Sequence, residues 1–345
     1  MSKFKVGLVG CGAISPMHLD ALKSLDMVEL AAVCDIREER AKAAAQQYNC
    51  RYYTDFNEML EDASLDAVHI CTPHYLHPVM AVQAAERKVN VLTEKPMSVS
   101  LEQADEMIKA CKDNNVTLGV IFQNRYNAGS ALIKKTLDSG ELGRILSGRL
   151  NVYWNRSDEY YSSSDWKGTW DKEGGGVLIN QAIHTMDLLR WFVDSPIEYV
   201  DANISNRAHP NIEVEDCAEG VIRYKNGVTT IFHALNYYTY DAPIEIEIHC
   251  EKGLVRLVSD KAVIRFCDGR ELTVDRDPAD QANTVGKDYW GISHRRQIED
   301  YYKSLMNGEK PFIDGEEARK TQAMICAVYQ SGKERRKVYL YNDIK

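Results

Sequence analysis

Short apolar runs alternate with amphipathic segments through the first third of the chain. The apolar runs predict β-strands at residues 5–9, 28–34, 67–70, 90–93 and 117–121. Apolar residues at helical spacing predict helices between them, at residues 16–24, 38–48, 56–61, 77–86 and 101–114. Ser100 followed by Gln103 is typical of a capping box at the start of the last helix. Strict alternation implies right-handed crossovers, so we expect an α/β, doubly wound parallel sheet covered on both faces.

The pattern changes after Arg125. It predicts a short helix at residues 131–139, a strand at 145–154 and, after three consecutive glycines, a helix at 178–192. From residue 198 onward it predicts mostly strands, with hairpin turns at Asn226-Gly227, Lys252-Gly253 and Asp268-Gly269. Helical patterns at 289–306 and 316–331 follow. A strand meander needs one covered face, so its other face is a candidate subunit interface.

Composition narrows the class of protein. A chain of 345 residues suits two domains, and 44% hydrophobic with 27% charged residues is typical of a soluble globular protein. The apolar runs fall short of the roughly 20 residues that cross a bilayer, and the first strand begins too early for a signal peptide. We therefore expect a cytoplasmic protein with no membrane partner.

Charge and cysteine usage exclude further classes. The net charge is −9 and the basic residues are scattered, which argues against a nucleic-acid partner. The nine cysteines form no CxxC pair, so we expect reduced thiols rather than a disulfide framework or a zinc site.

A glycine turn follows the first predicted strand. Gly10 permits a sharp turn and Gly12 lets the backbone approach a pyrophosphate at the helix N-terminus, while Ser15 replaces the third glycine of the fingerprint. Asp35 ends the second strand, where a carboxylate binds the adenine-ribose hydroxyls and favours NAD over NADP. Arg37 softens that preference, so NADP stays possible. The alternative is that Asp35 only starts the next helix.

Three further segments stand in order behind this turn. Thr72-Pro73-His74-Tyr75-Leu76-His77 follows the third run, Thr93-Glu94-Lys95-Pro96 follows the fourth, and a segment from Gly174 to His184 opens the long helix. Together with the glycine turn, this order resembles the Gfo/Idh/MocA oxidoreductase family over essentially the whole chain. The resemblance implies a Rossmann domain at residues 1–123. It also implies an α+β domain with a large, mostly antiparallel open sheet at residues 124–345, whose last helix packs back on the first domain.

The resemblance also implies the site. Substrate is expected between the domains, Lys95 beside the nicotinamide and the reacting hydroxyl, and His184 as the second active-site residue, with no metal. The expected NAD(P) contacts are Gly10, Gly12, Ala13, Ile14, Asp35, Arg37, Thr72, Pro73, His77, Glu94, Lys95 and Gln123. The expected substrate contacts are Lys95, Arg125, Trp166, Asn180 and His184.

The residue types fit alcohol oxidation. Asn180 and His184 are four residues apart and therefore share a helix face. A histidine suits proton transfer at neutral pH, so we assign His184 as general acid/base and Lys95 as electrostatic partner, although the two roles are exchangeable. Many family members carry aspartate where this chain has Asn180, and an amide cannot act as a carboxylate base.

Aromatic residues precede the three glycines. Trp166, Trp170, Tyr160 and Tyr161 are candidates to stack on a sugar ring, and the alternative is a packed loop without substrate contact. The remaining histidines, such as His18, His69 and His294, show no ligand spacing and are interpreted as structural.

The leading hypothesis is an NAD(P)-dependent dehydrogenase acting on a secondary hydroxyl of a sugar, glycoside or inositol. One alternative is redox-neutral glycoside cleavage through transient oxidation, and another is a non-catalytic NAD-sensing regulator. The exposed sheet face favours a homodimer or homotetramer.

Overall fold

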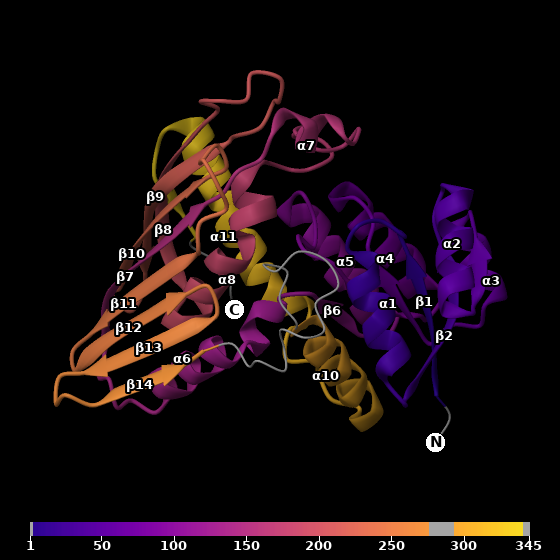
Figure 1. The fold of residues 1–345 in the computed structure, drawn as a ribbon, viewed down its shortest axis with the longest axis horizontal. Coiled ribbons are helices and arrows are strands. Elements are labelled where there is room, and N and C mark those ends of the chain that lie inside the picture. The colour runs from indigo at the N-terminus through magenta and orange to yellow at the C-terminus, as the bar shows by residue number, and fades with distance from the viewer. Residues whose placement is uncertain (1–2, 276–292, 341–345) are drawn as a thin grey trace. The chain divides into compact units, whose positions relative to one another are not determined.

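The computed structural model describes residues 3–275 and 293–340. The chain divides into two compact units, one of Met1–Gln123 with Asn283–Arg319 and one of Asn124–Ala282 with Lys320–Lys345 (Figure 1). Each unit is built on one sheet of its own.

The first unit contains a six-stranded parallel sheet, as the described residues show it, in the order β3-β2-β1-β4-β5-β6. Its strands are β1 (Phe4–Val9), β2 (Val28–Cys34), β3 (Arg51–Tyr53), β4 (Ala67–Ile70), β5 (Asn90–Thr93) and β6 (Leu118–Val120). The predicted parallel sheet is confirmed. The sequence missed β3, an edge strand of three residues whose side chains are exposed or half-buried and carry no apolar run.

The crossover helices lie where the apolar spacing predicts them. They are α1 (Ser15–Ser24), α2 (Glu38–Tyr48), α3 (Phe56–Asp62), α4 (His77–Glu86) and α5 (Leu101–Asp113). Ser100 Oγ accepts from the Gln103 amide at 3.3 Å, but the Gln103 side-chain oxygen makes no hydrogen bond within the described residues. Only half of the expected capping box forms. The strand order reverses between β1 and β4, and ligands of such sheets bind beside that point, at the carboxyl ends of the strands.

A helix from late in the sequence completes the first unit. Helix α10 (Ser293–Asn307) packs on α1 and contributes Ile298, Tyr301 and Tyr302 to the core beside the sheet. Gln297 donates to the Val120 carbonyl at 2.8 Å and accepts from the Phe122 amide at 3.0 Å, which ties the helix to the end of β6. The predicted helix began at residue 289, and its first four positions lie outside the described residues.

The second unit contains a nine-stranded sheet, again counted over the described residues, in the order β14-β13-β12-β11-β7-β10-β9-β8-β15. Its strands are β7 (Ile145–Tyr153), β8 (Ile197–Ser205), β9 (Cys217–Tyr224), β10 (Thr229–Leu235), β11 (Glu245–Cys250), β12 (Gly253–Val258), β13 (Lys261–Phe266), β14 (Glu271–Val274) and β15 (Val338–Tyr339). Only the β10–β7 pair is parallel among these strands, so the predicted, mostly antiparallel open sheet is confirmed.

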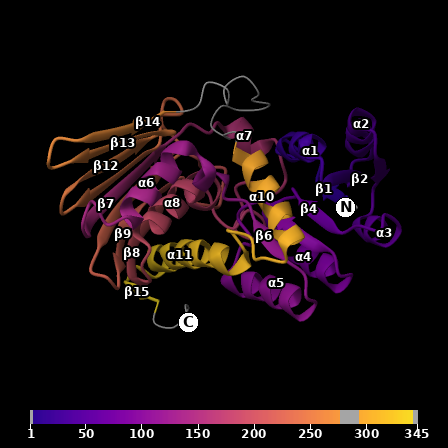
Figure 2. The ribbon, with the colours of Figure 1, turned by 90° about the horizontal axis from the view of Figure 1, so that it is seen from below.

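Helices cover one face of this sheet. Helices α6 (Ala128–Asp138), α8 (Ile183–Val193) and α11 (Gly315–Glu334) lie along the same side (Figure 2). Gly227 (φ 90°) and Gly269 (φ 92°) provide the left-handed backbone that the Asn-Gly and Asp-Gly hairpins require. None of the helices in residues 3–275 and 293–340 is long and apolar enough to cross a membrane.

Candidate active site

The turn between β1 and α1 is shaped for a close backbone approach. Gly10 has φ 95°, and a Cβ there would lie 2.6 Å from the Cys71 backbone, so only glycine fits. A Cβ on Gly12 would meet nothing within 4 Å, so open space lies in front of the turn. Ser15 Oγ donates to the Gly12 carbonyl at 2.8 Å and closes the turn onto α1. Such a turn at a helix N-terminus suits a pyrophosphate.

Asp35 is tied to this turn. It is 8% exposed, and its Oδ2 accepts from the Cys11 amide at 2.9 Å while Oδ1 accepts from the Arg37 amide at 2.8 Å. The carboxylate therefore both fixes the glycine turn and supports the entry to α2. Each oxygen has a second acceptor position, which ribose hydroxyls can use.

The segments after β4 and β5 are joined by one histidine. His77 is fully buried, with Nε2 2.8 Å from the Thr72 carbonyl oxygen and Nδ1 2.8 Å from that of Pro96. Burial lowers the pKa of His77, although both carbonyls favour its charged form. His77 lies between Thr72-Pro73 and Lys95-Pro96, which follow the neighbouring strands β4 and β5. It therefore holds these two segments together.

A buried chain of polar side chains lies next to Lys95. The Tyr302 hydroxyl lies 2.9 Å from Nε2 of His69, whose Nδ1 lies 2.8 Å from Nδ1 of His18. Glu94 Oε1 lies 3.0 Å from Nε2 of His18 and 3.3 Å from Nε2 of His294. An ionised carboxylate only accepts, so both imidazoles donate to Glu94. His18 then accepts from His69, and His69 accepts from Tyr302, so both ring nitrogens of these two histidines have a partner.

Burial alone would raise the pKa of Glu94, but hydrogen bonds from His18 and His294 hold that pKa well below its usual range. The second oxygen, Oε2, accepts from the Lys95 amide at 3.1 Å. Three of these residues place ligand atoms within 4.8 Å of one another, as a metal site would. His18, Glu94 and His294 are 76 and 200 residues apart along the chain, so no short sequence motif could have predicted the cluster.

In the second unit, three glycines precede a π-helical turn, η3 (Val177–Ala182), which continues into α8. A Cβ on Gly175 would lie 2.0 Å from the Tyr329 hydroxyl, and one on Gly176 would lie 1.9 Å from the Glu215 carbonyl oxygen. The Glu215 carboxylate accepts from the Gly176 and Leu178 amides at 2.8 and 3.0 Å. Close packing thus explains why glycine occupies positions 175 and 176. The Glu215 carboxylate binds the amide groups at the start of η3.

Asn180 lies in η3 and His184 in the first turn of α8. The predicted continuous α-helix is therefore corrected, because the turn around Asn180 is wider. A spacing of four residues still stays close to one turn in either helix type, so the two residues remain on one side. Asn180 Nδ2 donates to Glu173 Oε1 at 2.6 Å and to the Tyr160 hydroxyl oxygen at 3.1 Å.

Arg125, in the short helix η2 (Gln123–Tyr126), is 2% exposed. Its guanidinium binds the buried Asp187 through Nε at 2.7 Å and through its terminal nitrogen at 2.6 Å, and it stacks 5.2 Å from the Trp191 ring centre. Gln123, at the start of the same helix, is also buried. Arg125, expected from the sequence to contact substrate, is thus bound to a carboxylate inside the second unit, and its contact with substrate stays a prediction.

The aromatic segment divides into two kinds of residue. The Tyr161 hydroxyl accepts from Asn236 Nδ2 at 2.5 Å, and Trp170 donates to the Glu213 carbonyl at 2.9 Å, so both are packed into the unit. Trp166 is half-buried, and Tyr160 reaches Asn180. Tyr160 joins the candidate substrate residues through its direct contact with Asn180.

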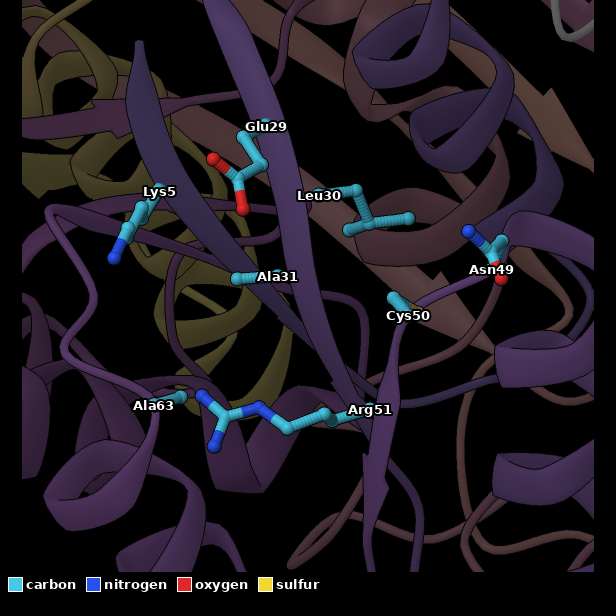
Figure 3. Close-up of a pocket in the computed structure, with 8 residues that line it drawn as sticks. All are labelled: Lys5, Glu29, Leu30, Ala31, Asn49, Cys50, Arg51 and Ala63. Carbon is cyan, nitrogen blue, oxygen red and sulfur yellow. The ribbon is translucent and has the colours of Figure 1, made fainter. Parts of the chain in front are cut away.

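A surface hollow elsewhere in the first unit does not coincide with these residues. It is lined by Lys5 of β1, Glu29 of β2, Arg51 of β3 and their neighbours (Figure 3). Lys5 and Glu29 stand near the amino ends of their strands, whereas Gly10 and Asp35 follow the carboxyl ends. The hollow is therefore separate from the glycine turn.

The fold and the glycine turn define a dinucleotide-binding protein of the Rossmann class, and comparison with known proteins gives the family. Residues 4–122 match the oxidoreductase family with an NAD-binding Rossmann fold, and residues 131–256 match the Gfo/Idh/MocA C-terminal domain. The chain belongs to the Gfo/Idh/MocA oxidoreductase family, as the sequence motifs indicated, and its cofactor is NAD.

Several relatives align along their whole length. Myo-inositol 2-dehydrogenase of Thermotoga maritima is 26% identical over 97% of this chain and 98% of that protein. The WlbA dehydrogenase of Chromobacterium violaceum, solved with NADH and UDP-GlcNAcA, is 33% identical over 100% of this chain and 98% of that one, with a TM-score of 0.88. WlbA of Bordetella pertussis, solved with the same ligands, is 32% identical over 99% of both chains, with a TM-score of 0.86.

Proposed function

We propose that this protein is an NAD-dependent dehydrogenase that oxidises a secondary hydroxyl of a sugar, with Lys95 and His184 as its polar pair. The observation that carries the proposal is the anchoring of Lys95 at the carboxyl end of β5, by Glu94 and the buried histidines. Dinucleotides bind at this edge of a doubly wound sheet, so Lys95 stands where a nicotinamide is expected.

The chemistry assigns one task to each residue. When bound, NAD would supply the hydride acceptor for the carbon that carries the hydroxyl. His184 removes the hydroxyl proton as the carbonyl forms, and the Lys95 ammonium stabilises the negative charge that develops on the oxygen. In the reverse direction His184 returns the proton. NAD is favoured over NADP because the Asp35 carboxylate repels a 2′-phosphate.

We further propose a nucleotide-linked sugar acid as the substrate. Both WlbA structures, at 32% and 33% identity, contain UDP-GlcNAcA, whereas the inositol dehydrogenase is 26% identical. Inositol or a free sugar is the second candidate, favoured by that enzyme's alignment with nearly the whole chain.

The experiment is a substrate panel of UDP-GlcNAcA, UDP-GlcNAc, myo-inositol and glucose with NAD⁺, followed by the absorbance of reduced nicotinamide. We expect turnover with UDP-GlcNAcA and a fall of about 10²–10⁴-fold in kcat for Lys95→Met and for His184→Asn. An NAD-sensing regulator would bind NADH without turnover of any compound. Product formed without net NADH would identify the redox-neutral alternative.

Two expectations from the sequence stay predictions. They are a cytoplasmic location and a homodimer or homotetramer formed through the second sheet. Light scattering of the purified protein measures the oligomeric state.

A further inference from the structure

We infer that Glu173 fixes the orientation of the Asn180 amide, so that Asn180 meets a substrate hydroxyl with its carbonyl oxygen and acts as a hydrogen-bond acceptor only. This makes Glu173 a positioning residue for substrate recognition. The inference rests on the proposed function, in which Asn180 contacts the sugar.

Glu173 is a fully buried carboxylate directly before the three glycines. Its Oε2 accepts from the Gly168 amide at 2.5 Å, and its Oε1 accepts from Asn180 Nδ2 at 2.6 Å. Both oxygens are therefore held by donors, and the shorter-than-average distance to Asn180 is typical of a bond to an ionised group.

Both N–H groups of the Asn180 side-chain amide donate to other residues of the protein. An amide nitrogen carries two hydrogens, and here one is directed to Glu173 and the other to the Tyr160 hydroxyl oxygen, 3.1 Å away. The group with which Asn180 can meet a hydroxyl is then its carbonyl oxygen. Turning the amide over would place that oxygen 2.6 Å from a carboxylate oxygen, two acceptors in contact, so an ionised Glu173 selects one orientation.

The Tyr160 hydroxyl is held in the opposite sense, as an acceptor toward the protein. Its hydroxyl oxygen accepts from Asn180 and, at 3.2 Å, from Gln181 Nε2, which fills both of its acceptor positions. A ligand can therefore meet Tyr160 only through its O–H. The Lys167 ammonium lies 3.8 Å from the centre of the Tyr160 ring and holds the ring in place.

Protonation of Glu173 would reverse the arrangement. A protonated carboxyl donates through one oxygen, so the amide would turn over and direct its NH₂ group outward. Burial raises the pKa of Glu173 to about 7, while the Gly168 and Asn180 hydrogen bonds oppose the rise. The other titratable groups that act on or near it are Glu215, Lys167, Tyr160, Tyr161 and Tyr329. Of these, Glu215 titrates in the same range, so variants of Glu173 itself are needed.

The test is a cycle of Glu173→Gln, Asn180→Asp and the double variant. In Glu173→Gln, the new amide oxygen keeps the Gly168 bond and its NH₂ group faces Asn180, which must turn its own NH₂ outward. In Asn180→Asp, two carboxylates face each other. In the double variant, the amide introduced at position 173 donates to the carboxylate introduced at position 180, which again offers an oxygen to the substrate.

We expect each single variant at pH 8 to lose about ten- to a hundredfold in kcat/KM, mostly through KM, and the double variant to recover to within about threefold of the wild type. NADH affinity should not change in any of them. Glu159→Gln, an exposed carboxylate of the same segment, is the matched control. Unchanged single variants, or losses that simply add in the double variant, would overturn the inference.

A second measurement does not require turnover. In protein labelled with ¹⁵N-asparagine, the Asn180 side-chain NH₂ signals, assigned by their loss in Asn180→Asp, should move with a midpoint near pH 7. The movement should vanish in Glu173→Gln, and signals that do not respond to pH in the wild type would refute the inference. If the wild type turns over no compound, the proposed function fails, and these spectra still decide the role of Glu173.

Discussion

Glu94 Oε1 lies 3.0 Å from Nε2 of His18 and is the acceptor at the end of a buried chain of two imidazoles and a phenol. The same oxygen faces His294, and the other oxygen receives the Lys95 amide. The backbone of Lys95 is therefore bound by a carboxylate that is itself held in the interior of the first unit.

Glu94→Gln should lower the free energy of unfolding by about 2–4 kcal/mol at pH 7, because an amide cannot accept from all three donors. The folded-state pKa of Glu94 lies below its unfolded value, so its contribution is present above the unfolded pKa and is lost as pH falls. The difference from wild type should therefore shrink in acid. Urea unfolding at pH 7 and pH 4 measures it, with the exposed Glu102→Gln as control. Equal differences at both pH values would contradict this account.

Asp35→Asn should weaken NADH binding by about tenfold and reduce the preference for NADH over NADPH. The amide offers one acceptor oxygen where the carboxylate offers two, and it no longer repels a 2′-phosphate. Fluorescence titration with both reduced cofactors gives the two Kd values. Glu38→Gln, on the exposed first turn of α2, should leave them unchanged. An unaltered ratio in Asp35→Asn would show that this carboxylate does not meet the ribose.

Arg125→Met should cost about 3–5 kcal/mol of unfolding free energy, because Asp187 is left buried without its bidentate partner. Arg125→Met combined with Asp187→Leu should be less destabilised than Arg125→Met alone, since neither of these two charges remains, although Arg190, 3.6 Å from Asp187, loses that carboxylate. Denaturant titrations compare them with Arg144→Met, which breaks an exposed pair with Glu251 and should cost less than about 1 kcal/mol. A double variant as unstable as the single one would argue against a buried ion pair.

The free energy of unfolding should fall as pH rises through about 7, because Glu173 then ionises in the folded protein. Burial raises its pKa from 4.5 to about 7, so its folded form favours the proton. The stabilisation is present below the unfolded pKa and is lost as pH rises through about 7, by at most about 3 kcal/mol. Unfolding free energies at pH 5.5 and 8.5 should differ less in Glu173→Gln than in wild type. Identical differences, with Glu159→Gln as control, would mean that Glu173 ionises normally.

Many helices, strands and turns of both units were predictable because the sequence patterns that specify them are local. Runs such as residues 28–34 and 67–70 coincide with β2 and β4, and the helix at 38–48 coincides with α2. Hairpins at Gly227 and Gly269 follow from the positive φ that glycine allows. Strand β3 was missed because three half-exposed residues carry no pattern, and η3 was missed because a π-turn has the same composition as an α-helix.

By itself, the sequence determined the class of the two sheets, the glycine turn and the family motifs that contain Lys95, Asn180 and His184, because periodicity and short motifs act over a few neighbouring residues. The tertiary structure alone decided that His18, Glu94 and His294 meet, that Arg125 binds Asp187, and that Glu173 and Tyr160 hold the Asn180 amide. Those contacts join residues up to 200 positions apart, and only the packing of whole elements brings such side chains within hydrogen-bond distance.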